Sequence, residues 1–580
     1  MYYQGIKKTI VTRPVLKQPH QLGNIHPLLA RILTNRGLTS QDVLERTLNK
    51  LPSPWLLSHM DNMVRHLITA LKHQERICVL ADFDADGATS CALAIKGLQA
   101  LGFQHINFVV PNRFKYGYGL TPEIIDLVQQ QSPHIILTVD NGISSIEGVE
   151  AAHQAGIKVL ITDHHLPGKQ LPAAEAIVNP NLVDDPFPSK TIAGVGVMFY
   201  VLMALRTRLR EMNWFTPQQP EPNLANLLDY VALGTVADVV ALDHVNRILV
   251  HQGLQRIRAG LAHPGIHALI EISGKQLNNL QATDLGFSLG PRLNAAGRMD
   301  DMSLGIQCLL ADHIGIAKPL ANTLNDLNNE RREVENQMKL EAGLRLQEIR
   351  SLEGKHLSSG VCLYNPSWHQ GVIGILAARI KDQLHRPVIA FAPADAGLIK
   401  GSGRSIPGLH IRDVLADIDT QHPKLIKHFG GHAMAAGLTL ELHDYPAFTL
   451  LFDNLVSKRL DHIDLEQKLL VDGALGENEL NIQFAELLQN ACIWGQGCPE
   501  PLFSNQFEVI QTRIVGQRHL KLIVRQTNSA QPIDAIAFFI DHPEQWLGIR
   551  ECLIVYALNI NEFKGQRTLQ LMIQYIEKIT

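Results

Sequence analysis

Short apolar runs alternate with amphipathic segments between residues 70 and 165. Each run holds four to six residues and is bounded by polar or turn-forming positions, as in strands buried on both faces of a sheet. The alternation predicts a parallel sheet with helices on both faces. The predicted strands cover 77–81, 105–110, 135–139 and 158–162. One predicted helix follows Gly87-Ala88-Thr89-Ser90, which would supply the turn and the capping hydroxyls, and extends to about Ala100. Two further predicted helices cover roughly 121–131 and 144–155.

Acidic residues follow three of these predicted strands. Asp82-Phe83-Asp84-Ala85-Asp86-Gly87 follows the first, Asp140 follows the third, and Asp163-His164-His165 follows the fourth. Because parallel strands bring their carboxyl ends to one edge, we expect these side chains in one crevice. Like charges this close repel one another unless a cation lies among them. A single acidic turn would equally suit a solvated loop, but three converging turns favour a metal site.

Asp238 lies in the otherwise apolar segment 230–240. An unpaired charge in apolar surroundings is costly. The residue would therefore cap a helix, pair with an arginine, or take part in the metal site. We favour the third interpretation.

The periodicity changes past residue 310. Apolar residues at spacings of three, four or seven within a charged segment predict one long helix, or alternatively an ordinary amphipathic helix of the first domain. A second α/β unit follows over about 353–455, with strands at 361–364 and 387–391 and a helix at 371–380. Gly401-Ser402-Gly403-Arg404-Ser405 is expected to form a loop whose amides, hydroxyls and guanidinium cradle an anion.

The two ends of the chain have different patterns. Residues 1–50 predict a small helical segment, with one helix at 27–33 and another capped by Thr39-Ser40-Gln41-Asp42. Short β-like runs at 507–510, 520–524 and 569–573 predict a small C-terminal barrel. The segment 494–501 before them is interpreted as a structural turn.

Length and composition agree with a multidomain protein. A chain of 580 residues exceeds what one core supports, so we expect three or more domains. No segment has the apolar length to cross a bilayer, and no apolar stretch follows the early basic residues, so we expect a cytoplasmic protein. Seven scattered cysteines without a Cys-x-x-Cys pair are expected to be reduced and mostly buried, with no zinc or disulfide role.

The formal net charge of −4 excludes a uniformly basic protein but not a nucleic-acid substrate. Two divalent ions in the acidic crevice would cancel four negative charges, and a local basic groove would still guide a polyanion.

The four acidic stretches, taken in order, resemble the signatures of the DHH phosphoesterase superfamily. They are Asp82-Phe83-Asp84-Ala85-Asp86-Gly87, Val139-Asp140-Asn141-Gly142, Asp163-His164-His165 and Gly234-Thr235-Val236-Ala237-Asp238. Three later stretches resemble the bacterial single-strand-specific exonucleases of that superfamily, and the likeness runs from about residue 50 to the C-terminus. These stretches are Gly290-Pro291-Arg292-Leu293-Asn294-Ala295-Ala296-Gly297-Arg298, Gly401-Ser402-Gly403-Arg404-Ser405 and Gly430-Gly431-His432.

The resemblance implies an α/β multidomain fold. It comprises an N-terminal helical segment (1–50), a parallel-sheet DHH catalytic domain (51–315), a long connecting helix that joins two domains across a cleft (316–352), a second α/β DHH-associated domain that binds substrate (353–456), and a C-terminal OB-type β-barrel (466–580).

Aspartates with few imidazoles and no thiolates form a hard site, which points to Mn²⁺ or Mg²⁺. The resemblance implies two ions, with Asp140 as the bridge, Asp82 and Asp84 completing one site, and Asp86, His164 and Asp238 completing the other. Smaller superfamily members have a histidine four positions before the middle carboxylate. Leu80 stands there in this chain, so Asp82 is assigned as the substitute ligand.

The resemblance further assigns catalytic roles to Asp84, Asp140, His164 and His165. Asp163 is expected to orient the histidines from behind the ligands. Three roles stay open for His165: metal ligand, stabiliser of the transition state, or proton donor.

Several cationic and aromatic residues are candidates for substrate binding. Arg113, Phe114, Lys115, Tyr116 and Tyr118 mix charge with aromatic faces, which suits a single strand, although a surface loop with buried aromatic residues is the plainer alternative. Arg292, Arg298 and His432 would bind substrate phosphates or form salt bridges at a domain interface. Ser402 and Arg404, together with Arg113, would hold the 5′ end.

The residues by themselves predict metal-dependent phosphoester chemistry. The resemblance implies 5′→3′ exonuclease action on single-stranded DNA, releasing 5′-mononucleotides, in DNA repair and recombination beside a single-strand-binding protein and a helicase. One alternative is a DHH phosphodiesterase for short oligonucleotides or cyclic dinucleotides, whose smaller relatives usually end after the second domain. The other is a single-strand nucleic-acid-binding protein without catalysis, which the complete carboxylate set disfavours.

Overall fold

The computed structural model describes most of the chain and divides it into two units with separate cores. The larger unit comprises Leu16–Asn329 and Gln489–Glu500, and the smaller unit comprises Met1–Val15, Glu330–Leu488 and Pro501–Thr580. The described residues are 8–15, 22–23, 25–41, 44–112, 116, 119–352, 358–460, 466–516, 518–527, 529–540, 542–563 and 565–579.

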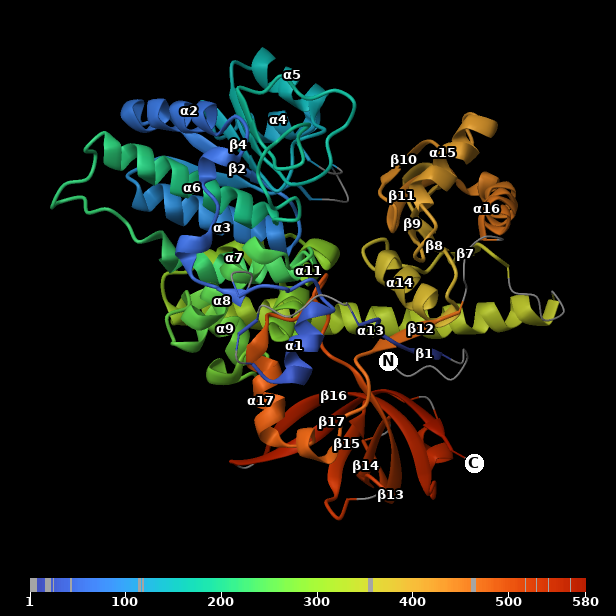
Figure 1. Cartoon of the computed structure of the whole chain (residues 1–580). Coiled ribbons are helices and arrows are strands. Elements are labelled where there is room, and N and C mark those ends of the chain that lie inside the picture. The colour runs from blue at the N-terminus through green and yellow to red at the C-terminus, as the bar shows by residue number, and fades with distance from the viewer. Residues whose placement is uncertain are drawn as a thin grey trace. The chain divides into compact units, whose positions relative to one another are not determined.

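The larger unit contains a five-stranded parallel sheet in the order β3-β2-β4-β5-β6 (Figure 1). Its strands are β2 (Ile77–Ala81), β3 (Ile106–Val109), β4 (Ile135–Val139), β5 (Lys158–Thr162) and β6 (Ala176–Val178). Ala81 pairs with Val139 and Val139 with Thr162, so β2, β4 and β5 end level. The residues after these strands therefore lie at one edge of the sheet. Strand β6 had no counterpart among the predicted strands.

Helices cover both faces of this sheet, as predicted. Ile77, Val79 and Ala81 pack into a core with α2 (Met60–His73), α3 (Ala85–Ala100) and α6 (Gly194–Glu211), whereas Cys78 and Leu80 pack into a second core with α4 (Pro122–Gln129) and α5 (Ile146–Gln154). Successive side chains of a strand point to opposite faces. An unbroken apolar run is therefore what a strand covered on both faces requires.

Helix α3 begins earlier than the sequence suggested. Asp84 has extended dihedral angles and accepts hydrogen bonds from the amides of Asp86 at 2.9 Å and Gly87 at 3.0 Å, so Asp84 is the N-cap. The prediction that Gly87 to Ser90 form the turn and cap is wrong, because an aspartate carboxylate upstream already satisfies the first amides of the helix.

The rest of the larger unit is helical. It contains α1 (Pro27–Thr34), α7 (Leu228–Ala237), α8 (His244–Arg258), α9 (Pro264–Ile272), α10 (Ala282–Asp284), α11 (Gly290–Met299) and α12 (Ser303–Leu310). Helix α7 is buried through Thr235 and contacts both α3 and α8. Its carboxyl end carries Asp238.

A single helix of 39 residues, α13 (Ile314–Leu352), confirms the predicted long helix. Its first part packs Ala317, Ala321 and Leu324 into the core of the larger unit. Its later part belongs to the smaller unit, where Met338 and Ala342 are buried.

The smaller unit contains the second α/β element, a mixed sheet in the order β10-β11-β9-β8-β7. Its elements are β7 (Val361–Tyr364), α14 (Ile373–Leu384), β8 (Val388–Pro393), β9 (Leu398–Arg404), α15 (Ile411–Gln421), β10 (His428–Gly431), β11 (Ala435–Glu441) and α16 (Tyr445–Leu460). The glycine-rich loop expected at Gly401-Ser402-Gly403-Arg404-Ser405 is wrong in form, because all but Ser405 lie in strand β9. The backbone of β9 pairs with β8 and β11, so its amides are not arranged as an anion-binding loop.

The C-terminal strands close into a barrel in the order β13-β14-β15-β17-β16, as predicted (red in Figure 1). They are β13 (Phe503–Val515), β14 (His519–Arg525), β15 (Ile533–Ala537), β16 (Glu551–Phe563) and β17 (Gln566–Lys578). Alternate residues of β14 and β15 are buried, which places one face of each strand inside the barrel.

The termini differ from the sequence-based expectation. The helix at 27–33 forms as α1, but Thr9–Thr12 forms strand β1, which pairs in parallel with β12 (Lys468–Val471). No α-helix follows Thr39-Ser40 among described residues 44–47. The short helix α17 (Ile482–Ala491) leads into the segment Gln489–Glu500, which joins the larger unit. None of the described helices is both long and apolar enough to span a membrane.

Candidate metal centre

Asp140 follows β4 in a left-handed backbone conformation, with φ of 63°. Its amide donates to Thr162 O on β5 at 3.0 Å, and the Asn141 side chain donates to Leu80 O at 3.1 Å and Val139 O at 2.9 Å. Aspartate and asparagine tolerate this conformation better than most residues. The turn holds the Asp140 carboxylate, 1% exposed, at the edge of the sheet.

Asp163 follows β5 and organises both histidines. Its Oδ1 accepts hydrogen bonds from the amides of His164 at 2.7 Å and His165 at 3.0 Å, and contacts His165 Nδ1 at 2.7 Å, while Oδ2 accepts from the amide of Ile143. With both oxygens engaged in this way, Asp163 lies behind the site, in the orienting position that we expected.

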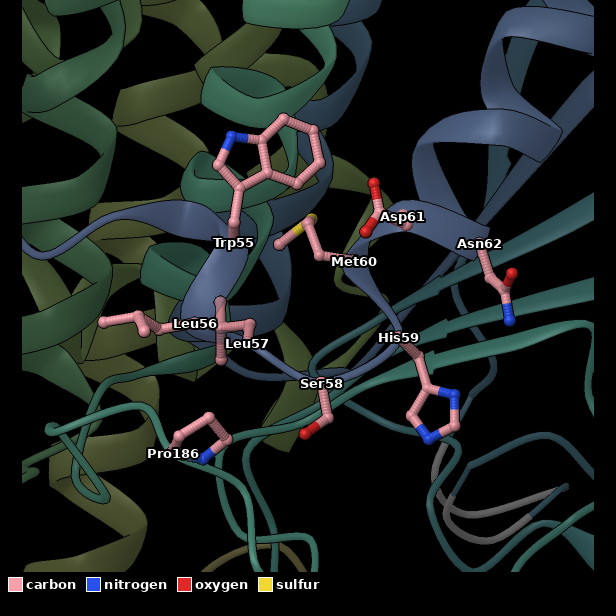
Figure 2. A pocket seen from close by; sticks show the side chains of 9 residues that line it. All are labelled: Trp55, Leu56, Leu57, Ser58, His59, Met60, Asp61, Asn62 and Pro186. Carbon is pink, nitrogen blue, oxygen red and sulfur yellow. The ribbon is translucent and has the colours of Figure 1, made fainter.

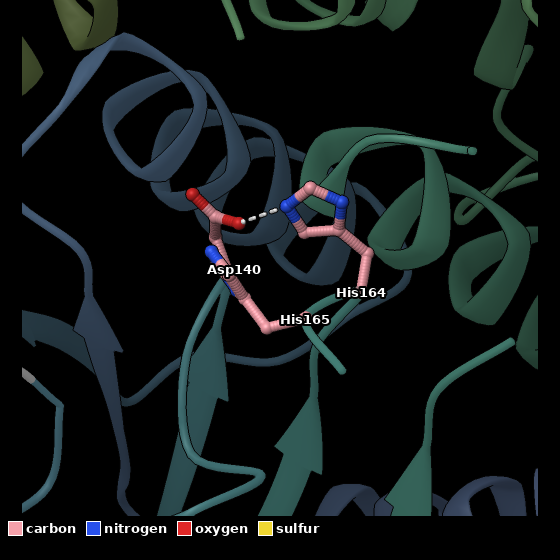
Figure 3. Close-up of side chains that lie close together, drawn as sticks. All are labelled: Asp140, His164 and His165. Carbon is pink, nitrogen blue, oxygen red and sulfur yellow. Dashed lines mark ion pairs between the residues drawn. The ribbon is translucent and has the colours of Figure 1, made fainter. Parts of the chain in front are cut away.

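His164 points from this loop to Asp140. Figure 3 shows the Asp140 carboxylate facing the imidazole ring, and His164 Nε2 lies 3.1 Å from Asp140 Oδ1. The same nitrogen lies 3.5 Å from Asp238 Oδ2, which comes from the carboxyl end of α7. Asp238 thus meets the residues of the sheet edge from a distant part of the sequence, and the polar side chain beside it is a histidine, not an arginine.

The acidic turn after β2 supplies the remaining carboxylates. Asp86 is fully buried, with Oδ2 accepting from the amide of Gly194 at 2.7 Å and Oδ1 from the amide of Val195 at 3.0 Å, at the start of α6. Asp82 is 5% exposed, and Asp84 is half-buried. A helix N-terminus stabilises a carboxylate through its unpaired amides and its dipole.

The ligand atoms gather into two adjoining triads and a third group that overlaps both. Within each group, one ligand atom from each residue lies within 4.8 Å of the others. One triad is Asp82, Asp84 and Asp140, the other is Asp86, His164 and Asp238, and the overlapping group is Asp140, His164 and His165. The contact between Asp140 and His164 joins the two triads. The structure therefore brings together all six residues that the sequence suggested as ligands.

Burial and mutual repulsion perturb the pKa values of these acids. Burial raises the pKa of Asp140 well above its usual range, and the nearby Asp86 and Asp84 raise it further. Burial and the neighbouring Asp238 raise the pKa of Asp86 in the same way. Burial, with Asp84, raises the pKa of Asp238 to about 7. Carboxylates this close together repel one another unless a cation lies among them.

The histidines are perturbed in opposite directions. Burial lowers the pKa of His164 to about 4, so its imidazole is neutral and has a lone pair to donate. Burial also disfavours the charged form of His165, but the bond to Asp163 outweighs it and raises the pKa of His165 to about 9.

These residues fit a pair of hard divalent ions. Five carboxylates and one neutral imidazole match the ligand preference of Mn²⁺ and Mg²⁺. The buried atoms His164 Nε2 and Asp238 Oδ2 make no hydrogen bond among the described residues. Both point into the cluster, which is where a cation would satisfy them.

Close backbone approach shapes the centre, and the sequence analysis assigned this role to none of the residues involved, although two of them lie in the motifs that it singled out. A Cβ at Gly194 would lie 2.6 Å from Asp140 Oδ1, and one at Gly234 would lie 2.8 Å from Asp86 Oδ1. Asn294 Oδ1 accepts from the amide of Ala85, the first residue of α3. The glycines of Ala193-Gly194-Val195-Gly196 were the available signal.

The residues predicted to bind substrate differ in burial and in their hydrogen-bond partners. Arg113 and Tyr118 lie outside the described residues. Arg292, on α11, is buried and donates to Ser288 O at 2.6 Å and Asn325 Oδ1 at 3.1 Å. Arg298 is half-buried in the last turn of the same helix.

Ser402 and Arg404 lie together in the smaller unit, at the amino end of α14. Arg404 Nη1 donates to Ser402 Oγ at 3.1 Å. A Cβ at Gly374, the second residue of α14, would lie 2.9 Å from both Ser402 Oγ and Arg404 Nη2. His432 is exposed just beyond β10. A hydroxyl and a guanidinium at a helix N-terminus form an arrangement suited to a phosphate group.

A separate pocket of about 340 Å³ is lined by residues 55–62 and Pro186 (Figure 2). Its backbone is fixed by Asp185, which accepts from the amide of Ser58 at 2.7 Å. None of the six candidate ligands lines this pocket, and we assign it no role in the chemistry.

Three family models match the chain in the order of its elements. The "DHH family, N-terminal domain" matches residues 76–235, the "DHHA1 domain" matches 357–458, and the "RecJ OB domain" matches 471–575. These matches correspond to the parallel sheet with its helices, the mixed sheet, and the barrel.

Relatives of known name align over nearly the whole chain. The single-stranded-DNA-specific exonucleases RecJ of Salmonella typhimurium and Escherichia coli are each 52% identical, over 95% of this chain and 96% of theirs. The crystal structure of RecJ in complex with Mn²⁺ from Thermus thermophilus aligns with a TM-score of 0.79 and 28% identity, over 98% of this chain and 79% of that one. The Mg²⁺ complex aligns with a TM-score of 0.74 and 26% identity, over 98% and 78% of the two chains. With a metal-ligand cluster at its sheet edge and full-length identity of this size, the chain belongs to the RecJ family of single-stranded-DNA-specific exonucleases.

Proposed function

We propose that this chain is a metal-dependent exonuclease that degrades single-stranded DNA from the 5′ end and releases 5′-mononucleotides. The observation that carries the proposal is the pair of adjoining ligand triads joined by Asp140 and His164. Family membership supports the substrate, and the family's Mn²⁺ and Mg²⁺ complexes support the choice of metal.

Asp82, Asp84 and Asp140 would hold one ion, and Asp86, His164 and Asp238 the other, with Asp140 between the two. When bound, such a pair activates water and stabilises the attacking and leaving oxygens of an in-line displacement. The chain's own contribution is to hold the ligands in place before substrate arrives. The α6 amides fix Asp86, and the left-handed turn fixes Asp140.

His165 is suited to act on the substrate instead of holding an ion. Its Nδ1 is engaged by Asp163, and its raised pKa of about 9 keeps the ring protonated at neutral pH. We assign Nε2 the role of donating a hydrogen bond or a proton to a phosphate oxygen, which is general-acid chemistry of the usual kind.

Ser402 and Arg404 would bind the 5′-terminal phosphate, with the amino end of α14 adding favourable dipole charge. Arg113 and Tyr118 are proposed to bind the strand that follows. Arg298 and His432 are proposed to contact phosphates. The bonds of Arg292 to Ser288 and Asn325 favour support of α11 over direct contact with substrate.

The test is product analysis on a long single strand that carries a 5′ phosphate and an internal label. We expect mononucleotides to appear from the 5′ end from the earliest times, with Mn²⁺ or Mg²⁺ present and not with a chelator. Arg404→Ala should raise KM more than it lowers kcat, whereas Arg386→Ala, in the same unit, should leave both unchanged. Rapid cleavage of dinucleotides without degradation of the long strand would instead support a phosphodiesterase for short substrates.

The remaining assignments extend the same proposal. The boundaries 51–315, 353–456 and 466–580 are proposed for the catalytic, substrate-binding and barrel domains, with 316–352 as the connecting helix. A cytoplasmic role in DNA repair and recombination, beside a single-strand-binding protein and a helicase, is proposed from family membership.

A further inference from the structure

Two cysteines in the segment Gln489–Glu500 lie next to each other. The Sγ atoms of Cys492 and Cys498 are 3.4 Å apart, and the residues are 4% and 2% exposed. Both are free thiols in the structure. A disulfide has an S–S distance of about 2.05 Å, so the two sulfurs need to approach by little more than about 1 Å.

The backbone between these cysteines forms a tight turn. Gly495 and Cys498 exchange two hydrogen bonds, of 2.9 Å and 3.1 Å, which brings Cys498 back towards Cys492. Gln496 and Gly497 at the tip are exposed. A small reagent would reach the buried dithiol from the side of this exposed tip.

Arginines surround the pair. Arg46 donates to Asn490 O at 3.2 Å, Arg36 donates to Pro499 O at 2.6 Å, and Arg247 donates to Leu242 O at 2.7 Å. The hydrogen bond between the two thiols lowers the pKa of Cys492, against the effect of burial, and Arg247 and Arg46 lower it further. The same bond raises the pKa of Cys498. Cations beside a thiol stabilise the nucleophilic thiolate and disfavour a metal cation between the sulfurs.

We propose that Cys492 and Cys498 form a reversible redox pair that a peroxide oxidises to a disulfide. The Cys492 thiolate attacks one peroxide oxygen and breaks the O–O bond, giving a sulfenic acid and hydroxide. The Cys498 sulfur then attacks the sulfenyl sulfur, forming the S–S bond and releasing a second hydroxide. The two thiol protons convert both hydroxides to water, so two thiols and one hydrogen peroxide give one disulfide and two waters.

The turn also contacts the chain segment that follows Asp238. The amide of Leu242 donates to Gln496 O at 2.7 Å, and a Cβ at Gly497 would lie 3.0 Å from the Ala241 Cβ. Val239, between them and Asp238, has φ of 64°, a strained conformation for a β-branched side chain. A closed disulfide would therefore hold Ala241 and Leu242 more firmly, close in sequence to Asp238. An effect on catalysis rests on the proposed metal role of Asp238, whereas formation of the disulfide does not depend on that role.

The first test treats the full-length protein with graded hydrogen peroxide and then counts thiols by alkylation and mass spectrometry. We expect two of the seven thiols to disappear first, and chymotryptic cleavage after Trp494 to leave two fragments joined by a disulfide that dithiothreitol breaks. Cys498→Ser should trap Cys492 as a sulfenic acid instead, and Cys552→Ser should form the link normally. Retention of both thiols, or overoxidation of Cys492 with Cys498 unchanged, would overturn the proposal.

A second measurement tests the coupling without reference to activity. Hydrogen exchange at the Leu242 amide should be slower in the oxidised protein than in the reduced protein, and peroxide should have no such effect in Cys492→Ser. A disulfide that forms while exchange at Leu242 is equal or faster would refute the coupling to the segment after Asp238.

Discussion

Two residues beside the acidic cluster adopt backbone conformations that their side chains do not favour. Asp140 has φ of 63°, which aspartate tolerates, whereas Val239 has φ of 64° although it is β-branched and 64% exposed. No packing gain of Val239 explains the strain. Strained residues persist where the surrounding structure imposes them, and here the left-handed residue directly follows Asp238, the residue that ends α7.

Asp140→Asn tests the bridging carboxylate with little change of shape. The amide keeps the volume and tolerates the positive φ, but it cannot supply the charge that a cation needs. We expect Mn²⁺ affinity, measured by titration calorimetry, to fall at least about tenfold, which is about 1.4 kcal/mol. Nuclease activity should fall with it.

The same variant should behave differently without metal. Because the pKa of Asp140 is raised in the folded state, its carboxyl costs folding stability as pH rises above the ordinary value of 3.8. Asp140→Asn should therefore raise the melting temperature at pH 7 in chelator. Asp126→Asn, an exposed control, should change neither quantity. Unaltered Mn²⁺ binding by Asp140→Asn would mean that the ligand assignment is wrong.

Gly194→Ala tests the close approach of α6 to the centre. Its new Cβ would lie 2.6 Å from Asp140 Oδ1, so the carboxylate or the helix has to shift. We expect weaker Mn²⁺ binding with far-ultraviolet circular dichroism unchanged. Gly315→Ala has no heavy atom within 4 Å of the new Cβ and serves as the matched control. Equal Mn²⁺ affinity in both variants would contradict the prediction that a Cβ at position 194 displaces the Asp140 carboxylate or the helix.

At the level of elements, a set of hydrogen bonds to one carboxylate attaches the later part of α13 within the smaller unit. Glu341 accepts hydrogen bonds from Gln337 Nε2 at 2.8 Å, Trp368 Nε1 at 2.9 Å and Ser367 Oγ at 3.2 Å. Trp368 is 4% exposed, so its indole needs this acceptor. The helix is therefore tied to the turn that follows β7 by one carboxylate.

Glu341→Gln should destabilise this attachment by about 1 kcal/mol at pH 7, because a neutral amide oxygen accepts these bonds more weakly than a carboxylate and the group is partly exposed to solvent. The bond from Gln337 lowers the pKa of Glu341, so the stabilisation is present above the ordinary value of 4.5 and is lost as pH falls through the lower folded value. Urea unfolding at pH 7 and at progressively lower pH should show the difference shrinking. Glu333→Gln, exposed on the same helix, should show no difference at any pH.

At the scale of the molecule, the two units have separate hydrophobic cores. The larger unit's main core gathers residues from α2, α3, α6, α7 and their neighbours, whereas the mixed sheet of the smaller unit packs on its own cluster, which includes Phe448 and Phe452. All six candidate ligands belong to the larger unit. Metal binding should therefore stabilise only one of them directly.

We expect calorimetric unfolding in chelator to contain more than one transition, with only one shifted upward by Mn²⁺. At a free Mn²⁺ concentration of 100 times Kd, one site adds about 2.7 kcal/mol to the stability of the unit that binds it. Asp140→Asn should abolish the shift. A uniform shift of every transition would contradict the assignment of the ions to the larger unit alone.

The sequence by itself determined the elements whose cause is local. Strands β2, β4 and β5, each followed by an acid, were predicted from short apolar runs, and α13 was predicted from its periodicity. Such patterns depend on neighbours within a few residues. Level strand ends then follow from parallel pairing, which is why Asp82, Asp140 and Asp163 were predicted to meet.

Only the tertiary structure decided what depends on distant segments. It brought the α6 amides to Asp86 and made Ser402 and Arg404 part of a central strand. It paired Thr9–Thr12 with β12 and placed Gln489–Glu500 in the larger unit. It also set Cys492 beside Cys498. These contacts result from packing between elements that lie far apart in the sequence, so no local pattern of residues predicts them.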